Sequence, residues 1–394
     1  MFLRVLLAGL VLIPFYELFL YLLMPGAKVP EWIDMRVTKE YMAVGSALAL
    51  TLIVWIKEKN LACPNVWALA FIGFLFLNLS KTPIAVHAPI VEVARLGAFS
   101  AEFKTLVFFL FFCAMTTVNI GKRQITMVLK TICLCGAVMA VYMIFQALHL
   151  DQVYRPLPTS QIGAVKNPAV AGTFGQPTLA VPFLALCVPL VVFFRRWWYL
   201  AVITVAIVLT GSDFALICLW FLLLLYSFRN KLLFVLTIPA ALAGAYMIFT
   251  HPAQYFNFNG RLEVWRQILQ DIFTGQIQGV SAHIGMTGAG LNNFGIVFTA
   301  LHSSPWTMAH NEYLQVLWTC GVIGLFIFLM IHVDIAKVAW MTSRYPGAPA
   351  IFLSLLMLAI CAMGTFTYQL GTYQFYLVVL VGLLYQIQRK GIRL

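Results

Sequence analysis

Residues 178–194 read TLAVPFLALCVPLVVFF, a run without a charged side chain, and the chain continues directly into Arg195 and Arg196. A helix of roughly 20 apolar residues crosses a bilayer core about 30 Å thick, and this run has that composition and nearly that length. The two arginines are typical of a cytoplasmic boundary, because short cytoplasmic loops are enriched in Lys and Arg. The stretch therefore predicts a transmembrane helix.

The composition extends this prediction to the whole chain. Of its 394 residues, 62% are hydrophobic and 10% are charged, whereas soluble domains carry about a quarter charged residues. The apolar segments lack the period-2 alternation of outer-membrane strands, so we predict an all-α, polytopic membrane protein that forms one integral membrane domain over 1–394. We expect twelve transmembrane helices, at 5–24, 41–56, 61–80, 105–119, 125–149, 178–194, 197–210, 214–228, 232–250, 312–333, 350–368 and 372–388.

The basic residues predict the orientation of these helices. With Arg4 inside, every predicted cytoplasmic turn is basic, and both termini are cytoplasmic. The net charge of +12 is distributed in pairs at membrane boundaries, which points to topology and membrane lipid headgroups and not to nucleic acid. The basic turns are Lys57/Lys59, Lys122/Arg123, Arg195/Arg196, Arg229/Lys231, Lys337/Arg344 and Arg389/Lys390/Arg393, and the longer exported loops are about 25–40, 81–104, 150–177 and 251–311.

The longest exported loop, 251–311, joins the predicted ninth and tenth helices. Connections of this length inside a compact protein are usually functional or disordered, and this one is rich in aromatic residues. Residues 260–269 predict an amphipathic helix with Leu262, Trp265 and Leu269 on its apolar face, lying on the membrane surface or over a cavity. Residues 288–295 predict a flexible turn whose backbone amides can approach a ligand.

Another exported loop carries Lys166-Asn167-Pro168 and then Gly172-Thr173-Phe174-Gly175-Gln176-Pro177 before a span. Glycine and proline interrupt regular structure there, so the helix that follows begins with free N–H groups. Such a helix end favours an anion.

His310-Asn311-Glu312 stands where the long loop enters a span, and the spacing of His310, Leu314 and Gly321 resembles the signature of the O-antigen ligase and polymerase family. Further motifs of that family occur in the same order, and the resemblance covers about residues 160–335. Where an asparagine is more typical, this chain has Gln176. The companion motifs are Gly260-Arg261-x-x-x-Trp265, Gly288-x-Gly290-x-x-x-Phe294 and the glycine/proline segment 172–177.

One position departs from the family pattern. Family members often have a serine-arginine pair where this chain has Gly211-Ser212-Asp213. If that arginine is functional, its role is absent here or is taken by Lys166 or Arg155.

The resemblance implies a C-type glycosyltransferase-like enzyme in the bacterial inner membrane. Such a protein takes a glycan from an undecaprenyl or other polyprenyl diphosphate carrier and joins it to an acceptor hydroxyl at the periplasmic face, with no metal and no cofactor. The acceptor is a lipid A core sugar, another carrier-linked glycan, or a hydroxyl on a protein. Short termini and the lack of a soluble domain favour the first two.

The leaving group of this reaction is a lipid diphosphate, whose developing charge a cation stabilises. Arg261 is the first candidate, because a guanidinium holds phosphate through two N–H groups and stays charged. Arg266 and Lys166 are second candidates for binding the donor. Alternatively, Arg261 binds a headgroup phosphate or stacks on Trp265.

The acceptor hydroxyl attacks better when a base takes its proton, and an imidazole titrates in the useful range. His310 is the candidate base, or else a hydrogen-bonding group for a substrate. Glu312 orients His310, acts as the base itself, or only complements the helix dipole, and Asn311 can hold a sugar hydroxyl. The other exported histidines, His251, His283 and His302, show no ligand spacing, so we expect no metal.

Two other classes of protein fit the helical plan. A transporter or flippase is expected to show paired broken helices and internal symmetry. A non-catalytic assembly partner would use the aromatic loop for docking and would tolerate substitution of Arg261 and His310. The distinctive residues lie on one face and in one long loop, which favours the enzyme.

Overall fold

The computed structural model is helical in the residues that it describes, which are 1–23, 35–78, 88–148, 150, 177–210, 261–274, 284–290, 294–298, 302, 308–365 and 370–392, and no strand occurs among them. The all-α prediction is therefore confirmed. The elements are α1 (Phe2–Leu23), α2 (Met35–Glu58), α3 (Val66–Asn78), α4 (Ala88–Thr117), α5 (Lys122–Ala147), α6 (Pro177–Phe193), α7 (Trp197–Leu209), α11 (Arg261–Thr274), α12 (Ile284–Thr287), the π-helix η4 (Phe294–Phe298), α14 (Glu312–Thr342), α15 (Ala348–Cys361) and α16 (Gly371–Lys390).

Four of the described helices contain segments long and apolar enough to cross a membrane: Lys39–Glu58, Ser100–Thr117, Lys122–Ala147 and Glu312–Thr342. Shorter apolar helices occupy most of the other predicted spans. The predicted spans 214–228 and 232–250 lie outside the described residues.

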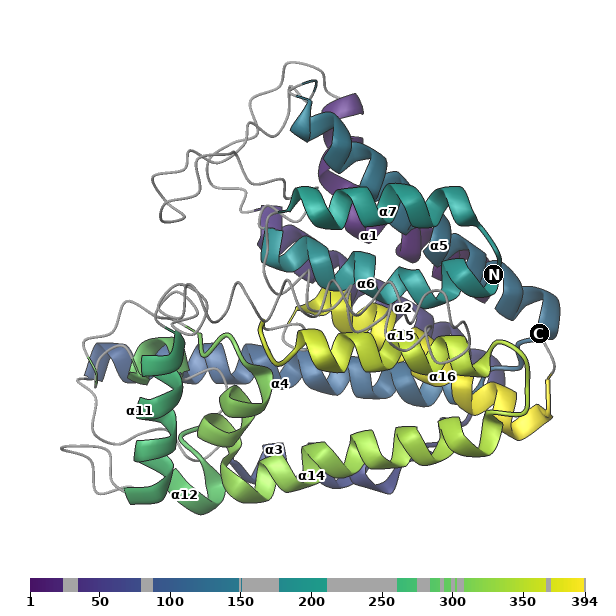
Figure 1. Ribbon diagram of the computed structural model, residues 1–394. Coiled ribbons are helices and arrows are strands. Elements are labelled where there is room, and N and C mark those ends of the chain that lie inside the picture. The colour runs from purple at the N-terminus through teal and green to yellow at the C-terminus, as the bar shows by residue number, and fades with distance from the viewer. Residues whose placement is uncertain are drawn as a thin grey trace.

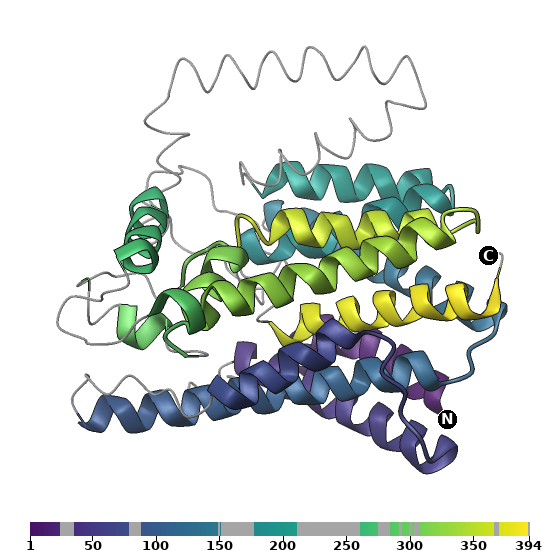
Figure 2. The same cartoon turned by 90° about the horizontal axis from the view of Figure 1, so that it is seen from below.

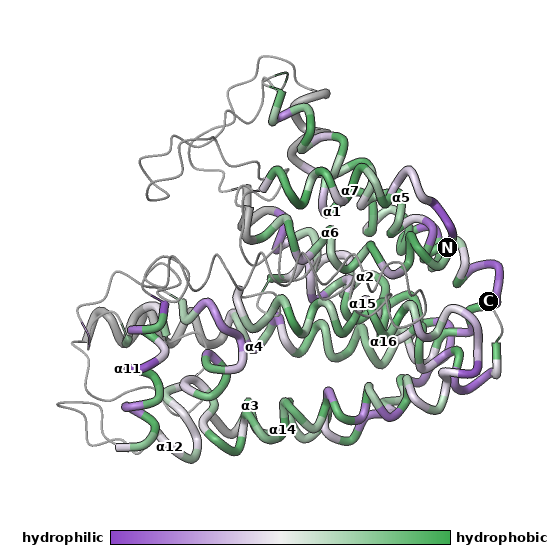
Figure 3. Tube along the Cα trace, viewed as in Figure 1, coloured by the Kyte–Doolittle hydropathy of each residue, from purple (hydrophilic) through white to green (hydrophobic). Residues whose placement is uncertain are grey.

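The helices form a bundle with two chemically different ends. Both chain termini lie at one end, and α11 and α12 lie at the other (Figures 1 and 2). Between the ends, α5 packs on α6 and α7, α15 packs on α6, and α4 packs on α2 and α16. Hydrophobic residues dominate these helices, and hydrophilic stretches concentrate near the termini and around α11 (Figure 3).

Helix α4 begins earlier than the hydropathy pattern predicts. Residues 88–104 were expected in an exported loop, but they continue the helix, which has 30 residues in all. Glu92, Arg95 and Glu102 interrupt the apolar run without interrupting the backbone hydrogen bonds of a helix. At 1.5 Å per residue α4 is about 45 Å long, longer than a bilayer core.

Helix α14 is broken at Gly321, whose φ of 69° and ψ of −173° are not helical. The Tyr313 ring lies 6.0 Å from the Phe328 ring and 6.1 Å from the His332 ring, whereas an unbroken helix would separate residues 313 and 332 by about 28 Å. The segment 312–320 therefore folds back along the rest of α14, which corrects the single predicted span 312–333. The remaining helix, 322–342, is about 31 Å long, close to the bilayer core.

Two glycines permit the break, because α14 and the chain after α12 approach each other there through their backbones. A Cβ on Gly321 would lie 2.4 Å from the backbone of Met286, and one on Gly288 would lie 2.3 Å from that of Thr319. Both glycines have positive φ, a conformation that other residues adopt only with strain. The amides of Ala289 and Gly290 donate to the carbonyls of Trp318 and Thr319, at 3.0 and 2.9 Å.

We expect Gly321→Ala and Gly288→Ala each to destabilise the protein by more than about 2 kcal/mol, since each adds backbone strain and a steric clash. Gly45→Ala is the matched control, because nothing lies within 4 Å of a Cβ there. Denaturation of the purified protein in micelles measures the three midpoints. A Gly321→Ala protein as stable as Gly45→Ala would contradict this account of the break.

Candidate functional site

Helix α11 is the predicted amphipathic helix of the long loop, extended to Thr274. Its predicted apolar face is partly buried only at Trp265, which packs against the cluster around Trp318, whereas Leu262 and Leu269 are exposed. Val264, Ile268 and Ile272 are buried. Both sets have helical spacing, so the sequence offers two apolar stripes. The structure buries the stripe that packs around Trp318.

Arg261 begins α11 and reaches the carbonyl end of α15. Its Nη1 donates to the Gly364 carbonyl at 2.9 Å, and its Nε is buried without a hydrogen-bond partner among the described residues. Burial lowers the pKa of the guanidinium, but an arginine keeps its charge in proteins. The site therefore holds a desolvated cation with hydrogen-bonding capacity left over.

His310 is fixed by the contacts of the residue before it. The Trp265 indole donates to the Ala309 carbonyl at 2.7 Å, and the Ala309 amide donates to Gln315 Oε1 at 2.8 Å. His310 itself has a φ of 51°, in the left-handed region. Outside glycine such a conformation is uncommon, and strain of this kind clusters at functional sites.

Burial lowers the pKa of His310 from 6.5 to about 4, and the positive charge of Arg261 adds to the effect. The imidazole is therefore neutral at pH 7 and can accept a proton. The charge of Arg261 thus acts on His310, although the two residues are 49 positions apart in the sequence.

The last turn of α15 organises the other side of the site. The Glu312 amide donates to the Ala362 carbonyl at 2.8 Å, and the Tyr313 hydroxyl donates to the Ala359 carbonyl at 3.0 Å. With Arg261 on Gly364, three carbonyls near this helix end are thus hydrogen-bonded to residues of the site. Glu312 is 2% exposed, so it is a buried acid in the first turn of α14.

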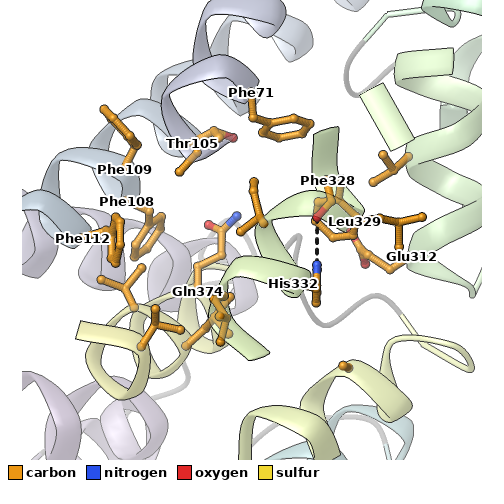
Figure 4. Close-up of a pocket in the computed structure, with 18 of the residues that line it drawn as sticks. Phe71, Thr105, Phe108, Phe109, Phe112, Glu312, Phe328, Leu329, His332 and Gln374 are labelled. Carbon is orange, nitrogen blue, oxygen red and sulfur yellow. Dashed lines mark hydrogen bonds between the residues drawn. The ribbon is translucent and has the colours of Figure 1, made fainter. Parts of the chain in front are cut away.

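A cavity of about 1100 Å³ extends from Glu312 into the bundle, between α3 and α4 on one side and α14, α15 and α16 on the other. Its walls are mostly apolar and aromatic. Figure 4 shows Gln374 between Phe108 and the Phe328–His332 side of the cavity, where His332 Nδ1 and the Phe328 carbonyl are 2.9 Å apart. The folded-back segment of α14 thus closes one end of an apolar chamber.

Several predicted site residues have other contacts or lie elsewhere. Asn311 caps α14, its side chain accepting from the Leu314 amide, and Arg266 is exposed on α11. The turn 288–295, of which residues 291–293 lie outside the described residues, is predicted to offer its amides to a ligand. Instead, the amides of residues 289 and 290 bind α14. Lys166, Gln176 and Arg155 lie outside the described residues.

Sequence reasoning missed two parts of the site. The carbonyls at the end of α15 are backbone groups, so no residue type in the sequence marks them. Only the position of the helix end could have predicted them. Asp271, a buried acid on α11, lies two residues beyond the predicted amphipathic helix and belongs to no motif. Among the described residues, no three His, Cys, Asp or Glu side chains converge as a metal site requires.

Comparison with known proteins identifies no relative, since neither a protein-family model nor a curated protein matches this chain.

We expect His310→Gly to unfold at a higher denaturant concentration than His310→Ala, by about 1 kcal/mol in stability, because only glycine adopts a positive φ without strain. Both variants remove the imidazole, so the pair separates backbone strain from side-chain chemistry. Equal midpoints for the two variants would mean that residue 310 is not strained.

Proposed function

We propose that this chain is a membrane enzyme that transfers a glycan from a polyprenyl diphosphate carrier to an acceptor hydroxyl. The observation that carries the proposal is a largely buried Arg261 whose charge acts on a neutral His310, two residues before Glu312, which lines an apolar cavity. A cation, a proton acceptor and a hydrocarbon compartment are the three features that such a donor requires.

Arg261 meets the leaving group. The diphosphate gains negative charge as the bond between the sugar C1 and the phosphate oxygen breaks, and a preorganised cation in a water-poor site stabilises that charge strongly. The Gly364 contact occupies Nη1 and leaves Nε without a partner among the described residues. The guanidinium can therefore hold one phosphate oxygen while it stays fixed to α15.

His310 receives the proton. As the acceptor oxygen forms its bond to C1, its hydrogen passes to the imidazole, and the lipid diphosphate departs with the bonding electrons. A pKa of about 4 makes the imidazole of the free enzyme a weak base. The negative diphosphate offsets the charge of Arg261, so donor binding raises the pKa of His310 toward the range in which proton transfer is efficient.

Glu312 and the cavity complete the arrangement. Glu312 lines the cavity at its end near the site, where its carboxyl group can orient the acceptor or the imidazole. The isoprenoid chain of the carrier occupies the apolar cavity that extends from Glu312 into the bundle. Its aromatic walls suit a branched hydrocarbon, whose burial contributes about 25 cal/mol per Å².

The proposed orientation has both termini in the cytoplasm and the α11 end in the periplasm of a bacterial inner membrane, with twelve spans, and the basic turns support it. The acceptor is then a lipid A core sugar or another carrier-linked glycan. A protein hydroxyl is the third acceptor consistent with the chemistry.

A transporter or flippase is the second candidate. The observation that favours it is the broken helix α14 beside a large cavity inside the bundle, since broken helices line the substrate sites of many transporters. A transporter would move the lipid-linked glycan across proteoliposomes without transferring it.

The direct test is transfer of a radiolabelled glycan from its polyprenyl diphosphate carrier in proteoliposomes. We expect Arg261→Ala to lower transfer about 100-fold or more, and Arg261→Lys to lower it less, because lysine keeps the charge but not the planar fork. Arg344→Ala, an exposed arginine beside Tyr345, is the matched control. If Arg261→Ala transfers glycan at the parent rate, Arg261 does not stabilise the leaving group. If the parent chain transfers no glycan, the result favours the transporter.

The pH dependence of kcat/KM reports the base of the free enzyme. Transfer needs the neutral imidazole, so we expect activity to fall as the pH drops through about 4, and to change little between pH 7 and pH 5.5. In Arg261→Gln the neighbouring charge is gone, which raises the pKa of His310, so the acid limb of the residual activity moves to higher pH. An acid limb near 6.5 in the parent would contradict this assignment.

A further inference from the structure

A second polar cluster lies on α11 away from Arg261. Asp271 Oδ2 accepts from Trp318 Nε1 at 3.1 Å and is 2.9 Å from His302 Nε2. Asp271 is 5% exposed and Trp318 is fully buried. Burying a carboxylate costs desolvation free energy unless the group is paired. An apolar residue at this position would not carry that cost.

Trp318 is the centre around which the elements of the long loop pack. Its carbonyl accepts from the Ala289 amide, and its ring meets the rings of Phe294 and Phe298 edge to face, at 5.1 and 5.9 Å. Trp318 belongs to the folded-back segment of α14 that also carries Glu312. Asp271 therefore joins α11 to the segment that positions Glu312.

Apart from Asp271, the buried residues of α11 are Val264, Ile268 and Ile272. Their packing is non-directional. Hydrogen bonds from Arg261 to the Gly364 carbonyl and from Trp265 to the Ala309 carbonyl hold the first turns of the helix. The hydrogen bond from the indole to Asp271 is also directional and restrains the rotation of the second half. Arg261 lies ten residues away, about 15 Å along the helix axis, so a turn or shift of α11 displaces its guanidinium.

We propose that Asp271 is a positioning residue: by accepting from Trp318 and pairing with His302, it fixes α11 so that Arg261 meets the leaving diphosphate. This inference rests on the proposed function for its catalytic consequence. The attachment of α11 to α14 is a property of the fold and is tested separately.

The experiment compares Asp271→Leu, Asp271→Asn and Trp318→Phe with Glu263→Leu, an exposed acid on the same helix, as the matched control. Hydrogen exchange of residues 261–274 is expected to rise in Asp271→Leu and Trp318→Phe, and to stay at the parent level in Glu263→Leu. Asp271→Asn keeps an oxygen for the indole and is expected to rescue most of the protection.

In the transfer assay we expect Asp271→Leu to lower kcat about 10- to 100-fold, since small misplacements of catalytic groups cost this much, with a much smaller change in KM for the donor. In an Arg261→Ala background, Asp271→Leu is expected to add little further loss, because both substitutions remove the same interaction. A general folding defect would instead reduce activity by a similar factor in either background.

Fully additive losses in the double variant overturn the positioning role, and so does unchanged exchange of α11 in Asp271→Leu. If the parent chain transfers no glycan, the proposed function fails on its own. The attachment is then judged by hydrogen exchange, where unchanged protection in Asp271→Leu overturns it and rescue by Asp271→Asn supports it.

Discussion

The left-handed backbone at Gly321 is the constraint on which the site depends. A continuous helix from Glu312 to Thr342 would be about 46 Å long and would carry Glu312 well beyond a bilayer core. The break instead turns the first segment back, so that Glu312 lies against the end of α15 and lines the cavity. Gly288 is required for the same reason, because no side chain fits between the two backbones.

The carbonyl end of α15 is the second organising feature. Such an end carries partial negative charge and unsatisfied acceptors, and here it receives the Arg261 guanidinium and the Glu312 amide. It therefore stabilises a cation in a place where burial alone would oppose one. Burial lowers the pKa of His310 and the same cation adds to the effect, so the helix end that holds Arg261 also contributes to the neutral state of the imidazole.

Hydropathy was sufficient to predict the all-helical class and the apolar parts of most described helices, because those segments have long apolar runs, and the family resemblance pointed to Arg261 and His310. Hydropathy did not predict the break in α14, because glycine is an ordinary residue in an apolar helix. Nothing local in the sequence distinguishes Gly321 from Gly45. Hydropathy also did not distinguish Val264 and Ile268, which are buried on α11, from Leu262 and Leu269, which are exposed and have equally good spacing. Those choices depend on Trp318 and α15, which are distant in sequence, so only tertiary packing resolves them.

Burial of the site has a consequence for the choice between transfer and hydrolysis. Water competes with any acceptor hydroxyl for the sugar carbon, and it would do so at high concentration in an open site. Glu312 is almost fully buried, and Arg261 and His310 are only partly exposed, which limits the water near the leaving group. A rigid attachment of α11 also limits water in the proposed site. If the helix loosened, Arg261 would move and water would enter. In the proposed reaction, the packing around Trp318 therefore protects the glycan as well as positioning Arg261.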